Sequence, residues 1–154
     1  MSTRCRIAVE QEDGTIKSIY CHHDGYKSGV GRTLKQHYTN PDEVEKLINL
    51  GDLSTLGTFY DKKLAEIRWK EWEMTEEERH KLWALTESMT LPYTDRGENH
   101  QVRIDENIVE FMGKIGKTGE EYTYLFTKDY TGVYGWEVCE TPYFEPLTGE
   151  EDDK

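Results

Sequence analysis

The segment 21–24, Cys-His-His-Asp, is the most metal-like part of the chain because a thiol, two imidazoles and a carboxylate follow one another. Alternate side chains of a strand point to opposite faces, so Cys21 and His23 would share one face while His22 points to the other. A tetrahedral site would then need a sharp backbone turn and a distant histidine. The sequence therefore predicts no metal and no cofactor, and a metal-dependent hydrolase around His22 and His23 is only the third of three functional hypotheses.

The three cysteines do not form a pattern that is typical of catalysis. A nucleophilic cysteine needs a neighbouring histidine that stabilises the thiolate, together with an oxyanion site. Cys21 has such neighbours, but its expected inward face indicates an inert thiol, and Cys5 and Cys139 have none. An odd number of cysteines without a Cys-x-x-Cys pair also argues against a disulfide framework and a four-thiolate zinc site. The chain is predicted not to be an enzyme.

The N-terminal third contains residues that suit an anionic ligand. The segment 29–32, Gly-Val-Gly-Arg, opens a predicted helix, where backbone N–H groups can hold a phosphate. It has too few glycines for a P-loop or a dinucleotide fingerprint. Arginines and tyrosines nearby can neutralise and stack on a nucleotide. The second hypothesis is therefore a small-ligand binder that sequesters a nucleotide signal, with a site made of Arg4, Arg6, Tyr26 and Arg32.

Tryptophans in a charged helical segment, residues 58–89, indicate a protein-binding surface. Trp69, Trp72 and Trp83 all lie in this segment, and tryptophan is enriched at binding hot spots. The alternative, expected for at least two of the three, is that they cover the sheet as ordinary core residues.

The net charge of −12 is concentrated in the last third of the chain, where residues 92–154 hold 6 Lys and Arg against 15 Asp and Glu. Such a field repels phosphate backbones and anionic lipid, so neither nucleic acid nor a membrane surface is the expected partner. An acidic surface instead suits a protein with a basic surface. The predicted partner-binding residues are Trp69, Trp72, Glu137, Glu140, Glu145, Glu150, Glu151 and Asp152.

Two predicted hairpins supply the strands that would position these residues. Alternation of apolar and polar residues in 5–10 and 16–22 surrounds an Asp-Gly turn, and a similar pattern in 122–127 and 133–139 surrounds 129–132. A helix is predicted from Ser28, with a second one capped by Asn40. These patterns predict an α+β fold, in which an antiparallel sheet is built from the N- and C-terminal hairpins and the helices pack on one face.

A chain of 154 residues is expected to form one domain, over residues 1–148, followed by an acidic tail over 149–154. Within it, residues 58–89 are a helical elaboration whose capping box, Thr75 to Glu78, opens a helix with Leu82, Leu85 and Met89 on one face. Further on, a short strand is predicted at 101–104 and a short helix at 107–112. The absence of a signal peptide and of a long apolar run predicts a cytoplasmic protein.

Several short segments resemble a known family. Residues 18–26 read Ser-Ile-Tyr-Cys-His-His-Asp-Gly-Tyr, 37–41 read His-Tyr-Thr-Asn-Pro, and 50–57 read Leu-Gly-Asp-Leu-Ser-Thr-Leu-Gly. Together they resemble a family of small bacteriophage and prophage accessory proteins that carry an "IYCHWDGY"-like segment. The later segment 94–98, Thr-Asp-Arg-Gly-Glu, matches the family's "RDRGE"-like segment in part.

The resemblance covers roughly residues 2–57 and, loosely, 90–148. His23 stands where the family more often has Trp, so a metal site that needs it would not be a family property. Thr94 stands where the family has Arg, which weakens an anion-binding role for that loop. The resemblance implies a phage accessory setting in the host cytoplasm. The first hypothesis is therefore a non-enzymatic, anti-defence inhibitor that binds a host defence or nucleic-acid-processing protein through its acidic surface.

Overall fold

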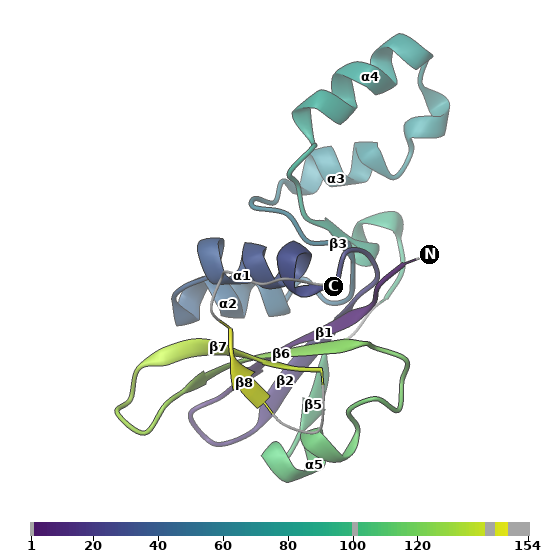
Figure 1. Ribbon diagram of the computed structural model, residues 1–154. Helices are drawn as coiled ribbons and strands as arrows, with labels where there is room; N and C mark the ends of the chain where they lie inside the picture. Colours follow the sequence, from purple (N-terminus) through teal and green to yellow (C-terminus); the bar gives the residue numbers. More distant parts are fainter. Residues whose placement is uncertain (1, 100–101, 141–143, 148–154) are drawn as a thin grey trace.

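A single sheet forms the centre of the molecule in the computed structural model, which describes residues 2–99, 102–140 and 144–147 (Figure 1). Eight strands are found in these residues, and seven of them follow the order β4-β3-β2-β1-β6-β7-β8, while β5 pairs with part of β2. The strands are β1 (Cys5–Glu10), β2 (Ile16–Cys21), β3 (Leu53–Thr55), β4 (Leu91–Pro92), β5 (Arg103–Asp105), β6 (Tyr122–Lys128), β7 (Tyr134–Cys139) and β8 (Phe144–Pro146).

Five α-helices accompany the sheet in the described residues, so the predicted α+β class is confirmed. They are α1 (Arg32–His37), α2 (Pro41–Ile48), α3 (Lys62–Arg68), α4 (Glu76–Leu85) and α5 (Ile108–Gly113). A π-helical turn at Lys27–Gly31 leads into α1, and 3₁₀ turns lie at Glu71–Glu73 and Tyr93–Arg96. The Asn40 side chain accepts a hydrogen bond from the Glu43 N–H at the start of α2, which confirms the predicted cap.

Both predicted hairpins form, as β1–β2 and β6–β7, but the sheet is mixed and not antiparallel. The two hairpins meet along β1 and β6, which run parallel, and β2 is parallel to β3. Parallel neighbours require a long crossover connection, and the segment between β1 and β6 supplies one. Alternation within a strand carries no information on the direction of a distant neighbour, so the predicted antiparallel arrangement missed the parallel β1–β6 and β2–β3 pairs.

The sheet buries apolar residues on both faces. One face, called the inner face, packs against α1 and α2 and includes Ile7, Tyr124 and Trp136. The other, the outer face, is covered by α5 through Phe111, which packs on Leu125. Figure 1 shows α1 and α2 on one side of the sheet and α5 on the other. The predicted packing of helices on one face is found for α1 and α2, whereas α5 packs on the outer face.

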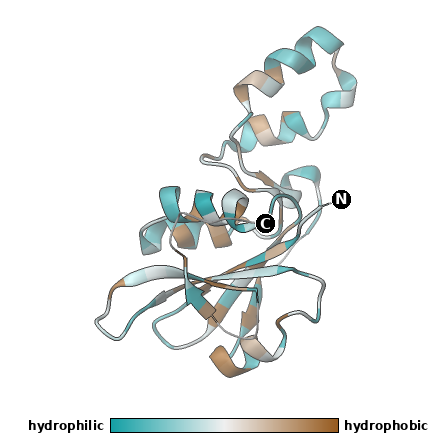
Figure 2. Ribbon diagram, in the orientation of Figure 1, coloured by the Kyte–Doolittle hydropathy of each residue, from teal (hydrophilic) through white to brown (hydrophobic). Residues whose placement is uncertain are grey.

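Helices α3 and α4 stand away from the sheet and form a projection, called here the helical arm, residues 59–88 (Figure 1). Its base is closed by the Thr58 N–H, which donates to the Ser88 carbonyl at 2.7 Å. Thr75 and Glu78 form the predicted capping box at the start of α4. Figure 2 shows that apolar residues recur in both arm helices, although the sheet lies elsewhere.

The predicted apolar face of the second arm helix is wrong in part. Leu82 is buried, but Leu85 is 66% exposed, and Met89 lies beyond the helix, which ends at Leu85. The Thr86 hydroxyl donates to the Leu82 carbonyl at 2.8 Å where the helix ends. The stripe therefore has no continuous surface to cover.

Among the described residues, no helix combines the length and apolar character needed to cross a bilayer.

Candidate functional site

The histidine segment is held by its neighbours and offers no metal site. The Nδ1 atom of His22 lies 2.6 Å from the Tyr20 hydroxyl, and the Nδ1 atom of His23 lies 2.9 Å from the Ser54 carbonyl. Cys21 is fully buried, as the alternation predicted. No group of three or more His, Cys, Asp or Glu with metal-binding geometry occurs in the described part of the chain.

The cysteines have the environment of structural thiols. Cys5 and Cys21 are paired across β1 and β2, and both are fully buried. Burial, followed by a hydrogen bond with Cys21, raises the pKa of the Cys5 thiol well above its ordinary value. A thiol that resists ionisation is a poor nucleophile, so this pair contributes packing and no chemistry.

The residues of the predicted nucleotide site are not brought together. The guanidinium of Arg6 lies on the outer face, where its Nη2 is 3.1 Å from Glu120 and its Nη1 donates to the Ser18 hydroxyl at 3.1 Å. Arg32 belongs to α1, which covers the inner face. The Tyr26 hydroxyl donates to Asp24. The predicted ligand site consisted of Arg4, Arg6, Tyr26 and Arg32. Because the sheet separates Arg6 from Arg32, these four residues do not form one site.

The helical arm holds a groove of about 660 Å³ in which the tryptophans meet arginines. Trp72 is 70% exposed and Trp83 41% exposed, while Trp69 is half-buried. The expectation that at least two of the three would be ordinary core is therefore wrong, because the arm does not lie on the sheet. The groove is lined by Arg68, Trp69, Glu71, Trp72, Arg79, Trp83, Leu91 and Arg96.

Trp69 is fixed at the base of this groove. Its indole Nε1–H donates to the Pro92 carbonyl at 2.8 Å, and its ring stacks on Tyr93 with 5.7 Å between the ring centroids. The guanidinium of Arg96 lies over both rings, 4.7 Å from the Trp69 centroid and 4.8 Å from that of Tyr93. Sequence reasoning missed the arginines, although Arg68 directly precedes Trp69 and Arg79 lies one helical turn before Trp83.

Large apolar side chains are exposed on the arm more than elsewhere. Half of the ten exposed large hydrophobic residues in the described part of the chain belong to it, although it comprises about a fifth of the chain. They are Phe59, Ile67, Trp72, Trp83 and Leu85. Exposed apolar surface that is concentrated on one element marks an interaction site more often than scattered exposure does.

The predicted acidic partner-binding residues lie apart from these tryptophans. The arm connects β3 and β4 at one edge of the sheet, whereas Glu137 and Glu145 belong to β7 and β8 at the opposite edge. Glu140 pairs with Lys27 at 2.7 Å. The remaining predicted residues lie outside the described part of the chain: Glu150, Glu151 and Asp152. A single surface that contains all eight residues is therefore not formed by those that the structure describes.

Just over half of the acidic residues that the structure describes in the last third are paired within the protein. Of the eleven acidic residues described there, six lie within ion-pair distance of a cationic side chain. These are Asp95, Glu98, Asp105, Glu110, Glu120 and Glu140. Paired carboxylates attract a basic partner less than free ones do, which weakens the predicted acidic docking face.

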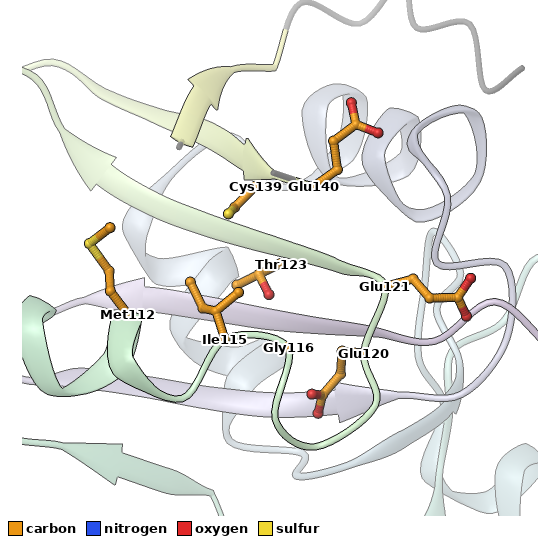
Figure 3. A pocket seen from close by; sticks show the side chains of 8 residues that line it. All are labelled: Met112, Ile115, Gly116, Glu120, Glu121, Thr123, Cys139 and Glu140. Carbon is orange, nitrogen blue, oxygen red and sulfur yellow. The ribbon is translucent and has the colours of Figure 1, made fainter. Parts of the chain in front are cut away.

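A second hollow, of about 510 Å³, lies on the outer face between the β6–β7 pair and the loop that follows α5 (Figure 3). It contains three glutamates, which Figure 3 shows pointing in different directions. Glu120 is held by Arg6 and Glu140 by Lys27, and the third accepts a backbone N–H. Burial raises the pKa of Glu120, but the Thr118 hydroxyl and Arg6 outweigh it and leave that pKa below its ordinary value. Each of these carboxylates has a partner within the protein, and they do not form a catalytic pair.

Comparisons of the chain with protein-family models, curated proteins and solved structures found no match. The resemblance to bacteriophage accessory proteins therefore stays a prediction, and function has to be inferred from the surfaces of the molecule.

Proposed function

We propose that the protein is a non-enzymatic accessory protein that binds and thereby inhibits a protein of the host cell, and that the helical arm makes this contact. The observation that carries the proposal is the exposure of Trp72. This residue is 70% exposed in the groove of the helical arm, which stands away from the sheet. Tryptophan is enriched among the residues that dominate binding energy.

The exposure of the arm disfavours a purely structural role. Burying a large apolar side chain is worth about 1.5–3 kcal/mol, and Trp72 and Leu85 forgo most of that gain. A second protein that covers them would recover it. The arm is also fixed before binding, because the Tyr60 hydroxyl donates to Asp95 at 2.5 Å and Lys62 pairs with the same carboxylate at 3.2 Å. Preorganisation of this kind lowers the entropic cost of association.

The two other parts of the proposal have separate support. The resemblance to phage accessory proteins supports a partner from the host cell. The net charge of −12 favours long-range attraction of a protein with a basic surface, although the helical arm is nearly neutral, with 6 Lys and Arg against 8 Asp and Glu. Charge would therefore guide the encounter, and the apolar arm would supply the contact.

Affinity purification with arm variants tests the proposal. The tagged protein is incubated with bacterial host lysate at low and high salt, and each recovered protein is then titrated in purified form. We expect the double variant Trp72→Ala, Leu85→Ala to lower the affinity for the recovered partner by about thirtyfold, since loss of a hot-spot residue costs about 2 kcal/mol or more.

Tyr130→Ala is the matched control, because Tyr130 is fully exposed in the β6–β7 turn, away from the arm. It should leave the affinity unchanged. A partner that binds the arm variant as tightly as the unmodified protein would refute the role of the arm. Recovery of no host protein at low salt would refute the function itself.

A further inference from the structure

The groove on the arm is locally cationic in a strongly acidic protein. Three of its lining residues are arginines, and its one acidic lining residue is Glu71. Glu71 is already engaged, since it pairs with Arg68 at 2.6 Å and also accepts the indole N–H of Trp83. The local charge therefore has the opposite sign to the net charge of −12, which points to an anionic group in whatever occupies the groove.

Arg79 is the arginine with donors to spare. Arg68 has Glu71 as its partner, and Arg96 is paired with Glu98 and stacked on two rings. Arg79 donates from Nη1 to the Met74 carbonyl at 2.7 Å, and no described carboxylate lies within ion-pair distance of it. A guanidinium has five N–H donors in a planar fork that fits a carboxylate through two parallel hydrogen bonds.

The aromatic residues of the groove define the second feature of its occupant. Trp72 and Trp83 expose much of their indole rings. Because the Nε1–H of Trp83 is used by Glu71, the exposed part of that ring is suited to an aromatic or large aliphatic side chain. A volume of about 660 Å³ is typical of sites for small molecules or a few side chains.

We propose that the groove binds a short segment of the partner protein in which a carboxylate side chain stands next to an aromatic or large aliphatic one. The carboxylate pairs with Arg79, and the apolar side chain packs against Trp72 and Trp83. This inference rests on the proposed function, because it names the chemistry of the partner segment that the arm binds.

Other acidic residues limit the occupant to few negative charges. Three exposed glutamates follow Trp72 closely in the sequence: Glu73, and Glu76 and Glu77 in the first turn of α4. A single-stranded nucleic acid offers the same combination of stacking and negative charge, but each added phosphate would meet these carboxylates and the overall field. A peptide with one carboxylate satisfies Arg79 without that repulsion, which is why we favour it.

Titration of the full chain with defined peptides tests the inference. The probe is a capped peptide, Gly-Ser-Asp-Phe-Ser-Gly, followed through tryptophan fluorescence and the indole N–H resonances of Trp72 and Trp83. Comparison peptides carry Asn or Lys in place of Asp, or Ala in place of Phe. We expect the Asp-Phe peptide to bind more tightly than all three and to bind less tightly as salt is raised.

Variants of the arm locate the binding. Arg79→Gln should lower the affinity for the Asp-Phe peptide at least roughly tenfold, the loss expected for a hydrogen-bonded charge. Trp72→Ala should lower this affinity as well. Lys81→Gln removes the same charge from an exposed position of the same helix outside the groove, so it should have little effect. Circular dichroism of each variant verifies that α4 is retained.

Several results would overturn the inference. These are equal or tighter binding of the Lys peptide, equal effects of Arg79→Gln and Lys81→Gln, or no binding of the Asp-Phe peptide up to its solubility limit. Tighter binding of oligothymidylate that is lost in Arg79→Gln would assign the groove to nucleic acid instead. The proposed function fails separately, when no host protein is recovered at low salt, because peptide binding is measured without that partner.

Discussion

Asp105 shows how one side chain can join two elements on the outer face. Its carboxylate has no exposed surface and lies 3.1 Å from the Arg103 Nε and 2.5 Å from the Lys114 Nζ, so it ties β5 to the end of α5. Burial raises the pKa of Asp105, but the two cations outweigh it and hold the pKa below its ordinary value. A lowered folded-state pKa stabilises the fold at pH values above the unfolded pKa, near 3.9, and that stabilisation is lost as pH falls through the folded pKa.

Replacement of this carboxylate should therefore have a pH-dependent cost. We expect Asp105→Asn to lower the free energy of unfolding at pH 7 by about 1–3 kcal/mol, since it removes charged hydrogen bonds from a buried site. The deficit should shrink as pH falls from the unfolded pKa, about 3.9, through the lower folded pKa, because the native carboxyl group becomes protonated over that range. Urea denaturation at pH 7 and at an acidic pH below that range measures this. Glu110→Gln, at an exposed pair with the same lysine, should cost no more than about 0.5 kcal/mol. An equal deficit at both pH values would contradict the assignment.

At the scale of elements, α4 depends on its ends more than on tertiary packing. Leu82 is its one buried residue, so little apolar burial holds it in place. The Thr75 hydroxyl accepts the Glu78 N–H at 3.2 Å, and the Glu78 carboxylate accepts the Thr75 N–H at 2.9 Å. A helix of ten residues is marginal by itself, and this capping box is therefore a large share of what stabilises α4.

We expect Thr75→Ala to destabilise α4 locally by about 1 kcal/mol. Because the arm stands off the sheet, the loss should appear as faster amide hydrogen exchange in 76–85, while exchange in β1 and β6 is unchanged. Glu78→Gln should accelerate exchange less than Thr75→Ala, since an amide oxygen can still accept the Thr75 N–H. Equal acceleration of exchange in the arm and the sheet would show that the two unfold together.

Elements that are determined by residues close together in the sequence were predictable. Features that are determined by contacts between distant residues were not. The two hairpins, the Asn40 cap and the Thr75 capping box each depend on residues within a few positions of one another. Strands β3, β4 and β8 contain two or three residues, too few to show a period. The direction of β6 relative to β1 and the outer-face position of α5 are set by contacts across many residues, which a periodic pattern does not encode.

The same distinction applies to the candidate site. Trp69 and Trp72 were identified by residue type, because tryptophan in a charged helix is unusual. The expectation that at least two of the three tryptophans would cover the sheet was wrong, because the arm that carries them stands away from the sheet. Among the predicted acidic contact residues, Glu140 is paired by Lys27, a residue 113 positions away. Charge counts along a sequence cannot detect such pairing.

At the scale of the whole molecule, the arm is structurally separable from the sheet. Neither of the two apolar clusters of the sheet contains a residue from 59–88. The chain enters and leaves the arm at adjacent points, where the Thr90 N–H donates to the Phe59 carbonyl at 2.8 Å. The arm contacts the rest mainly through Asp95 and Tyr93, which follow β4. We therefore expect the sheet to act as the scaffold, and removal of the arm to abolish the proposed binding.

Replacement of residues 60–87 by a flexible Gly/Ser linker tests this division. The shortened protein should keep a cooperative urea transition, because both apolar clusters are intact, with a smaller m-value since less surface is exposed on unfolding. It should no longer bind the host partner or the Asp-Phe peptide. Trp136 is then the only tryptophan in the chain, and because it is buried in the inner-face core, its blue-shifted emission reports directly on the folded sheet. A shortened protein with red-shifted emission and no cooperative transition would mean that the arm is part of what folds the sheet.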